Sequence, residues 1–442
     1  MASTYITRTV SSAGNQKTWT LSFWFKRTSN VINGDAYIFS YAQGSGQARG
    51  AIDIDATNQN FLVQFNPTGS AWTTHTVTSR KIRDVSAWYH IVVKCDTTQA
   101  TDSNRLKVYI NGENQTLDSY PAQNFDTGFN ASYQHTLGRY EDADSSYLDG
   151  LLTHIHWTDG YAYDASSFGE TDSTSGIWKA KTSPSVTYGT NGFFLKFENS
   201  GAMGTDSSGN TNTFTVSGTL TQNVDTPDNN FCTWNPLTQN GGTYLNGNTT
   251  RTGGDDTGAS MGVTNGKWYW EMKKANTTAG NHFGICSTSS GFNNSSLQML
   301  NGESGSVGAS IWLSLTGTAA TGYGNAAGFS NVNYSGISSV SIANGDIVGC
   351  ALDISTSSGT LTFYKNGSSL GAATFTYDQK TPVFPFIRNN SGATTDTNFG
   401  SGFFGTTAVA SANADGNGVG KMEYAVPSGY YTLNTKNLKE FG

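Results

Sequence analysis

The sequence is poor in charge, in helix-forming residues and in long apolar runs. Asp, Glu, Lys and Arg make up 13% of its 442 residues, about half of the usual share. Glutamate occurs only 8 times, although long solvent-facing helices depend on Glu, Lys and Arg. No stretch approaches the roughly 18 consecutive apolar residues of a membrane-spanning helix. A helical bundle and a coiled coil are therefore excluded, and we expect no membrane insertion.

Basic clusters and paired cysteines are also lacking. The net charge is −7 and the most basic stretch, 80–83, is short, so we expect no nucleic-acid partner. The first ten residues have no apolar core of the secretory type, which predicts no signal peptide and synthesis in the cytoplasm. No two cysteines form a C-x-x-C pair, and we expect buried free thiols rather than disulfides or a metal site. The cysteines are Cys95, Cys232, Cys286 and Cys350.

Glycine and aromatic residues are abundant instead. The chain has 52 glycines. Phe, Trp and Tyr make up 12% of it, so the folded protein can bury a large apolar surface, which argues against disorder. Apolar residues alternate with polar ones in short segments such as Trp19–Lys26, the pattern of half-buried strands. Similar strands are expected at 37–41, 51–55, 61–65, 88–96, 106–111, 151–157, 267–272, 282–286, 347–354 and 360–365. The fold class is therefore all-β.

One pattern occurs in both halves of the chain. The segments 105–112 and 360–367 each read as a strand that runs into Asn-Gly, the strongest short signal for a β-hairpin. Two sandwiches of related topology explain this better than one large sheet. We assign 1–225 to the first sandwich, 226–405 to the second, and 406–442 to a C-terminal arm that docks on something else.

The first half resembles the laminin-G-like branch of the concanavalin-A-like lectin and glucanase superfamily. The resemblance is carried by the segments 19–27, 88–93, 106–112, 147–152 and 195–210. The second half resembles a SPRY domain, another sandwich of concanavalin type. Its motif segments are 266–271, 283–285, 345–353, 361–367 and 382–386. The resemblance implies two concanavalin-A-like jelly-roll β-sandwiches in tandem.

The tandem arrangement as a whole resembles structural proteins of tailed phages, especially marine ones. The junction 226–231 and the ending 427–430 carry this likeness. It implies a virion location, virion proteins as partners, and a homo-oligomer such as a trimer. Because the chain has no coiled-coil heptads and no repeat shaft, a fibre tip, a knob or a capsid decoration fits better than a complete fibre.

Motifs for catalysis are missing. The glucanases of this superfamily carry a Glu-x-Asp-x-Glu strand, and no such segment occurs here. The nearest candidates are Asp53 with Asp55, on one face of a strand, and a loop at 141–144. The sequence has no Gly-x-Ser-x-Gly elbow followed by a helix, and no phosphate-binding loop. We therefore expect no enzymatic activity, with a glycan-degrading enzyme as the weaker alternative.

Two sets of residues are metal candidates. Laminin-G-like domains often bind calcium through Asp and backbone oxygens at the sandwich rim, and the resemblance implies such a site at Asp142, Asp144 and Asp149. Asp residues in loops are also common turn formers, which is the alternative. His154 and His156 lie two apart, on the strand face of Leu152, but no third ligand is visible. We expect them to lie under a neighbouring segment.

Aromatic side chains in loops are the candidates for sugar recognition, because lectin-like sandwiches stack such rings on sugars. They are Trp72, Tyr140 and Tyr147 in the first domain, and Trp312 and Tyr323 in the second. Core packing or a subunit contact is the alternative for each. The main hypothesis is attachment to a host cell-surface glycan. The second is a structural virion subunit that makes only protein–protein contacts.

Overall fold

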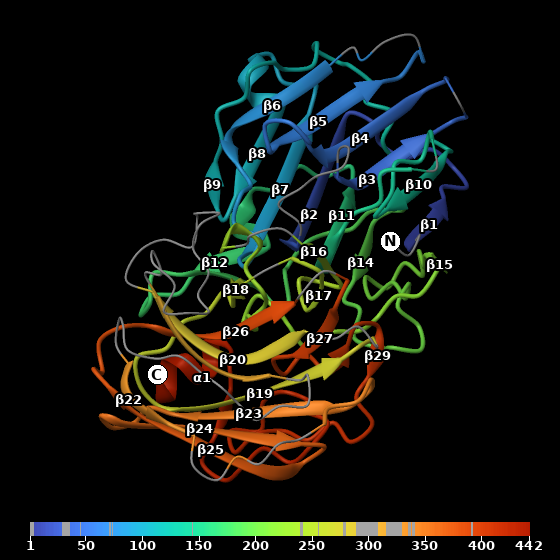
Figure 1. The fold of residues 1–442 in the computed structure, drawn as a ribbon. Helices are drawn as coiled ribbons and strands as arrows, with labels where there is room; N and C mark the ends of the chain where they lie inside the picture. Colours follow the sequence, from blue (N-terminus) through green and yellow to red (C-terminus); the bar gives the residue numbers. More distant parts are fainter. Residues whose placement is uncertain are drawn as a thin grey trace. The chain divides into compact units, whose positions relative to one another are not determined.

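The computed structural model describes residues 4–28, 36–44, 46–69, 72, 74–143, 145–238, 242–254, 256–276, 280–288, 308–314, 329–334, 337, 341–389 and 392–442. The chain forms two compact units, Met1–Gln222 and Asn223–Gly442. Each is a β-sandwich, so the prediction of two sandwiches in tandem is confirmed (Figure 1).

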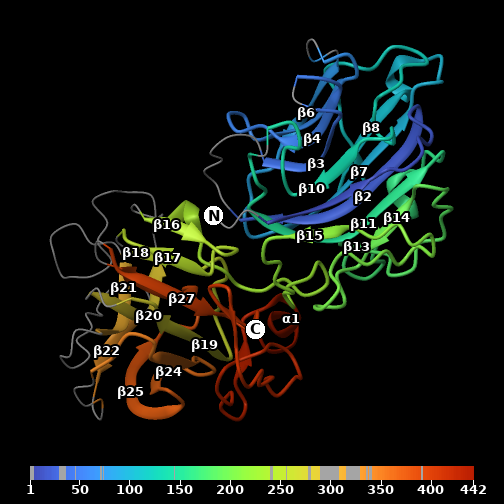
Figure 2. The same cartoon turned by 90° about the vertical axis from the view of Figure 1, so that its right-hand side faces the viewer.

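The first unit is built from two large antiparallel sheets that face each other (Figure 2). One sheet has the strand order β15-β1-β10-β3-β4-β5-β6, and the other has the order β14-β11-β2-β7-β8-β9. The bounds of the first are Tyr5–Thr9 (β1), Ala36–Ala42 (β3), Arg49–Ile54 (β4), Asn60–Asn66 (β5), Thr74–Lys81 (β6), Gln134–Leu137 (β10) and Thr215–Ser217 (β15). Those of the second are Thr18–Arg27 (β2), Trp88–Asp96 (β7), Leu106–Ile110 (β8), Glu113–Asn114 (β9), Gly150–Asp159 (β11) and Phe193–Leu195 (β14).

The core of the first unit lies between these sheets and follows from the alternation in the sequence. Trp19, Leu21, Phe23 and Phe25, which share one face of β2, are all fully buried in it. A smaller hairpin, Gly169–Thr171 (β12) with Trp178–Ala180 (β13), lies outside the six-stranded sheet, and two short 3-10 helices span Asp102–Asn104 (η1) and Ala165–Ser167 (η2). Trp178 of this hairpin packs against Trp24, on the outer face of β2.

A β-bulge in β11 changes which way its side chains point. The pairing with β2 shifts between Thr153 and His156, and His154 has a positive φ of 48°. Leu152 lies opposite Phe25, on the core side, whereas His156 lies opposite Ser22, on the outer side. The prediction that the two histidines share the face of Leu152 is therefore wrong, because the extra residue of the bulge breaks the alternation.

The second unit also has two sheets. The larger has the order β16-β17-β27-β19-β23-β24-β25-β22, with β30 added to β19, and the smaller has the order β18-β26-β20-β21. The bounds in the larger sheet are Thr243–Leu245 (β16), Thr250–Thr252 (β17), Lys267–Lys274 (β19), Phe329–Asn333 (β22), Ile347–Asp353 (β23), Ser358–Lys365 (β24), Ser368–Tyr377 (β25), Thr394–Asn398 (β27) and Tyr431–Thr432 (β30). The smaller sheet has Asp256–Gly258 (β18), Asn281–Thr288 (β20), Gly308–Ser314 (β21) and Val383–Asn389 (β26). A short hairpin, Phe403–Phe404 (β28) with Thr407–Ala408 (β29), and a 3-10 turn, Pro236–Thr238 (η3), complete the unit.

The C-terminal residues 406–442 pack on this second sandwich. β30 pairs in parallel with the first half of β19, and the chain ends in the helix α1 (Thr435–Phe441), which Asn434 caps by accepting the backbone N–H of Asn437. The buried carboxylate of Asp415 accepts hydrogen bonds from Thr432 and from the Asn437 side chain. Through Asp415, these hydrogen bonds link the helix α1 to β30, which belongs to the larger sheet. In the described part of the chain, no helix combines the length and apolar character needed to cross a membrane.

Candidate ligand-binding site

The seven-stranded sheet of the first unit carries buried polar side chains on the face opposite the core. Phe39, Ile52 and Val63 point into the core, and their neighbours along the strands point the other way. Several polar residues of the sheet that point this way are buried, which means that other parts of the chain cover much of this outer face. These polar residues include Ser40, Asp53, Gln64, Asn66 and Thr136.

Arg49 is the centre of a cluster on this face. Its guanidinium lies 5.4 Å from the centre of the Trp72 ring, and its Nη1 lies 3.7 Å from Oδ2 of Asp142. The hydroxyl of Tyr140 lies 3.5 Å from the same carboxylate oxygen. Asn66 is the residue directly opposite Arg49 on the next strand. We call these five residues the Arg49 site.

Two donors in the Arg49 site have no acceptor among the described residues. They are Nε of Arg49 and Nδ2 of Asn66, and both are buried. The side-chain oxygen of Asn66 is used, because it accepts the backbone N–H of Gly69 at 2.8 Å. Residues that lie opposite each other in an antiparallel sheet have neighbouring side chains on one face. The two unused donors are therefore close together, and each costs about 1–3 kcal/mol when buried without an acceptor.

Tyr140 is held in place from one side by another ring. It stacks on Tyr37 with ring centres 4.4 Å apart and an angle of 24°. Burial raises the pKa of Tyr140 to about 12, and the negative charge of Asp142 adds to this effect. The Tyr140 hydroxyl is therefore protonated at neutral pH and available as a hydrogen-bond donor.

Three of the predicted site residues thus come together, and the others do not join them. Trp72 and Tyr140, predicted as sugar-binding aromatics, and Asp142, predicted as a calcium ligand, all belong to the Arg49 site. Tyr147 instead lies beside Tyr5, with ring centres 6.1 Å apart. Tyr323 and Asp144 lie outside the described residues, and of Trp312 only the backbone, in β21, is described.

The two described calcium candidates have different partners. Asp142 accepts the backbone N–H of Gly46 at 3.1 Å and lies near Arg49. Asp149 accepts the hydroxyl of Thr28 at 2.8 Å, and burial raises its pKa. Among the described residues, no group of three or more His, Cys, Asp or Glu side chains could hold a metal ion. With Asp144 outside those residues, the calcium site stays a prediction.

The histidines form an aromatic cluster on the outer face of the six-stranded sheet. His156 is 2% exposed and stacks on Phe194 at 3.9 Å. His90 lies against Trp24 and receives a hydrogen bond at Nδ1 from the Trp178 indole, at 2.9 Å. Burial lowers the pKa of His90 to about 3, so the ring is neutral. The position of His156 under a covering segment agrees with the expectation from sequence.

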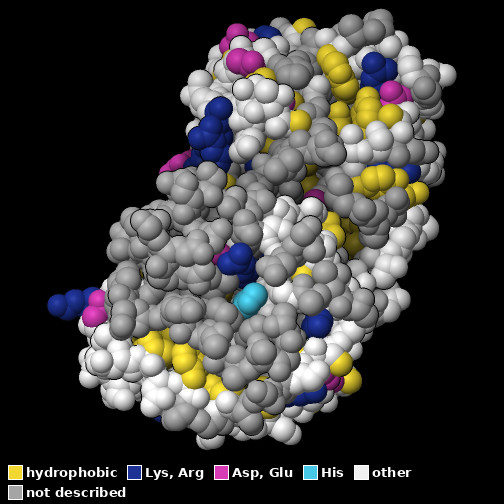
Figure 3. Space-filling model, in the orientation of Figure 1, with side chains coloured by type: hydrophobic (Ala, Val, Ile, Leu, Met, Phe, Trp, Pro, Cys, Tyr) yellow, Lys and Arg dark blue, Asp and Glu magenta, His cyan; other side chains and the backbone are white. Residues whose placement is uncertain are grey.

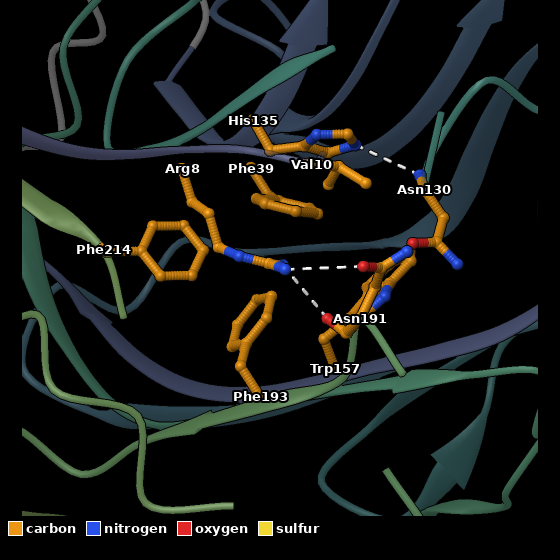
Figure 4. A pocket seen from close by; sticks show the side chains of 9 residues that line it. All are labelled: Arg8, Val10, Phe39, Asn130, His135, Trp157, Asn191, Phe193 and Phe214. Carbon is orange, nitrogen blue, oxygen red and sulfur yellow. Dashed lines mark hydrogen bonds between the residues drawn. The ribbon is translucent and has the colours of Figure 1, made fainter. Parts of the chain in front are cut away.

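A small pocket lies at one edge of the first core (Figure 4). Arg8 points into it and donates to Asn191, while Oδ1 of the buried Asn130 has no hydrogen-bond partner within the described ranges. There is room for about one water-sized molecule, which could donate to this oxygen. The pocket is too small for a sugar. It is lined by Arg8, Val10, Phe39, Asn130, His135, Trp157, Asn191, Phe193 and Phe214.

The sequence points to Trp72 and Tyr140 as sugar-binding rings and to Asp142 as a calcium ligand, but not to Arg49 or Asn66 as site residues. It presents Asp53 only as a carboxylate pair with Asp55. In the structure β4 ends at Ile54, and Asp55 forms the following turn by accepting the N–H groups of Thr57 and Asn58. Arg49 and Asn66 lie just outside the predicted strands 51–55 and 61–65, at positions that continue their polar faces.

On the face seen in Figure 3, the Lys and Arg side chains of the described residues are scattered among acidic and uncharged ones.

Two family models match the chain. Residues 2–162 match the concanavalin A-like lectin/glucanases superfamily, and residues 267–402 match the SPRY domain. The chain carries these two domains in tandem. The resemblance seen in the sequence is confirmed at this level, and both sandwiches are of concanavalin-like jelly-roll type.

Several solved structures are similar to parts of the chain. A heptameric SAP-like pentraxin from Limulus polyphemus has 16% identity and a TM-score of 0.28, over 36% of this chain and 71% of that chain. The SPRY domain of human HERC1 has 18% identity and a TM-score of 0.27, over 37% of this chain and 96% of that chain. A sialidase CBM40 from Ruminococcus gnavus, bound to alpha2,3 sialyllactose, has 15% identity and a TM-score of 0.27. The match covers 35% of this chain and 79% of that chain. No curated protein matches the chain.

Proposed function

We propose that this chain is a non-enzymatic virion surface protein whose first sandwich attaches the particle to a host cell-surface glycan through the Arg49 site. The match to a superfamily of lectins and glucanases supports a sugar ligand for this sandwich. Rings with a polar edge, such as Trp72 and Tyr140, are suited to the apolar face of a sugar. Polar groups beside them would fix its hydroxyls.

The observation that carries this proposal is the pair of unused donors. Nε of Arg49 and Nδ2 of Asn66 belong to directly opposite residues of β4 and β5, and both are buried without an acceptor in the described part of the chain. Buried polar groups in native proteins almost always have partners, and an exception calls for an explanation. A ligand oxygen that accepts from both donors supplies one. The half-buried Trp72 and Asp142 both lie beside the Arg49 guanidinium.

The virion role rests on the tandem arrangement and its likeness to structural proteins of tailed phages. In this proposal the chain forms a fibre tip, a knob or a capsid decoration, assembled as a homo-oligomer such as a trimer. The second sandwich, which matches the SPRY domain, then supplies contacts with other virion proteins. Imaging of labelled particles tests this part, and absence of the chain from the virion would overturn it.

The glycan part is tested on an array of host-surface glycans, in buffer that contains calcium. We expect wild-type protein to bind a subset, and Arg49→Ala to weaken that binding at least tenfold. Arg80→Ala is the matched control, because Arg80 lies on β6 of the same sheet and pairs with the exposed Glu113. Equal binding by wild type and Arg49→Ala would refute the Arg49 site as the glycan site.

A purely structural subunit is the second candidate, and the SPRY match is the observation in its favour, because it fits a protein-interaction role. In this case the particle requires the chain for assembly, but the purified protein binds no glycan on the array. Release of reducing sugar from host envelope material would instead favour an enzyme.

A further inference from the structure

The charges around the Arg49 site limit which sugars it can hold. Arg49, Ala51 and Asp53 follow one another on one face of β4, so the carboxylate of Asp53 lies on the same face as the guanidinium. Asp142 supplies a second carboxylate, from the loop above. Asp53 is not a member of the Arg49 site, but its charge acts on Tyr140, which is. Together with Asp53, the site has one positive and two negative groups and a net charge of one negative unit.

The neighbouring ion pair of Arg139 and Glu141 does not change this balance. Glu141 lies next to Asp142 in the sequence, but its carboxylate accepts a hydrogen bond from Arg139 at 2.7 Å. Gln134 and Thr136 also donate to Glu141. This ion pair is neutral as a whole, and it does not offset the surplus negative charge at Arg49.

The carboxylate of Asp142, in the Arg49 site, and that of Asp53, outside it, differ in their availability to a ligand. Both oxygens of the fully buried Asp53 accept from the Gln64 amide, at 2.9 and 3.1 Å. Oδ2 of Asp142 lies 3.7 Å from Arg49 and 3.5 Å from the Tyr140 hydroxyl, at or beyond the limit of a good hydrogen bond. Asp142 therefore keeps an oxygen that can accept from a ligand, beside donors that lack acceptors.

We propose that the Arg49 site takes an uncharged sugar through two adjacent hydroxyl groups and discriminates against acidic sugars. A hydroxyl both accepts and donates a hydrogen bond, so each can accept from Arg49 or Asn66 and donate to Asp142. A sugar carboxylate only accepts, and it adds a negative charge next to Asp142 and Asp53. Asn66 is 0% exposed, and its buried Nδ2 has no partner among the residues that the structure describes; this donor is the observation that points to a ligand here.

This inference rests on the proposed glycan-binding function, and its test separates the two. The ligands are two oligosaccharides with the same linkages, one made of hexoses and the other of the matching uronic acids. They differ only at carbon 6, a hydroxymethyl group in one and a carboxylate in the other. We expect the wild type to bind the neutral one at least tenfold more tightly by calorimetry at low salt.

Asp142→Asn removes one negative charge while keeping the shape of the side chain. We expect it to reduce the preference for the neutral sugar at least fivefold, mostly by tighter binding of the acidic one. Asp126→Asn is the matched control, since the Asp126 side chain is 63% exposed and its ion pair with Lys17 is 3.9 Å long. Unchanged far-ultraviolet circular dichroism and melting temperature would show that both variants fold.

Each outcome decides a different point. Tighter binding of the acidic sugar by wild type, or an unchanged ratio in Asp142→Asn, would overturn the inference while the glycan-binding function stands. Binding of neither sugar, together with no binding on the wider array, would overturn the proposed function and the inference with it. The preference should also shrink as salt rises, because salt screens the repulsion.

Discussion

Tyr424 donates its backbone N–H to the buried carboxylate of Glu271, at 2.9 Å, and so ties the C-terminal segment to the middle of strand β19. The neighbouring N–H of Glu423 donates to the other oxygen, at 2.8 Å. The side chain of Glu271 is 0% exposed, and the Tyr269 hydroxyl also donates to it.

Replacement of Glu271 by Ala should therefore loosen the C-terminal segment. It leaves two backbone N–H groups without their acceptor, and we expect a loss of about 3 kcal/mol from the free energy of unfolding of the second unit. Hydrogen exchange should speed up at 422–432 more than in the β23–β24 hairpin. Glu271→Gln keeps one acceptor oxygen and should lose about half as much. Equal exchange in both segments would contradict this account.

The stability of the second unit should also depend on the protonation of Glu271. Burial raises the pKa of this carboxyl from 4.5 to about 7. Because the folded state holds the proton more tightly, the contribution is fully present below pH 4.5 and is lost as the pH rises through 7. The total change is on the order of 3 kcal/mol. Urea unfolding of wild type and Glu271→Gln at several pH values measures it, and a parallel pH dependence in both would refute it.

The first unit should lose stability in acid for the opposite reason. Burial lowers the pKa of His90 to about 3 and that of His135 to about 4, so both remain neutral when folded. In the unfolded chain they take up protons below about pH 6.5. Stability should therefore fall as the pH drops from 6.5, by about 2 kcal/mol for each histidine at pH 5.

Nuclear magnetic resonance of the His90 ring checks the same point. The Trp178 indole donates to Nδ1, so the proton of the neutral ring must be on Nε2, facing the Ser22 hydroxyl at 2.9 Å. We expect this tautomer to persist to about pH 4, where an exposed histidine is fully charged. Titration of His90 near pH 6.5 would contradict its burial.

Gly50 should not tolerate a side chain, although it lies in an ordinary extended strand. A Cβ atom there would overlap the ring of Tyr41, its cross-strand partner. Tyr41 is fully buried and its hydroxyl donates to the Thr127 carbonyl at 2.7 Å, so the ring cannot move away. We expect Gly50→Ala to cost about 2 kcal/mol by urea unfolding. Gly44→Ala is the control, because the nearest atom to its Cβ is a flexible Gln47 side chain at 3.6 Å.

The strands and their buried faces could be predicted because alternation is a local property of the sequence. All four apolar residues on one face of β2 lie in the core. Both Asn-Gly turns also behave as expected, since Asn111 and Asn366 have positive φ values of 52° and 47°. Such features depend on a few neighbouring residues and need no knowledge of the rest of the fold.

The polar part of the Arg49 site could not be predicted in the same way. Arg49 and Asn66 are 17 positions apart, and only the register between β4 and β5 places them opposite each other. Alternation shows which face a residue takes but not which partner it meets. The bulge at His154 is a similar case, because one positive φ reverses the face of the following residues.

Backbone hydrogen bonds connect the two ends of the second unit to each other. Near its start, the N–H of Cys232 donates to the carbonyl of Leu433, and near its end, the N–H of Thr435 donates to the carbonyl of Asn230. The polypeptide thus enters and leaves this sandwich at neighbouring points. A domain whose two ends lie close together can be inserted into a surface loop of another protein, or circularly permuted through a short linker, without a change in its interior.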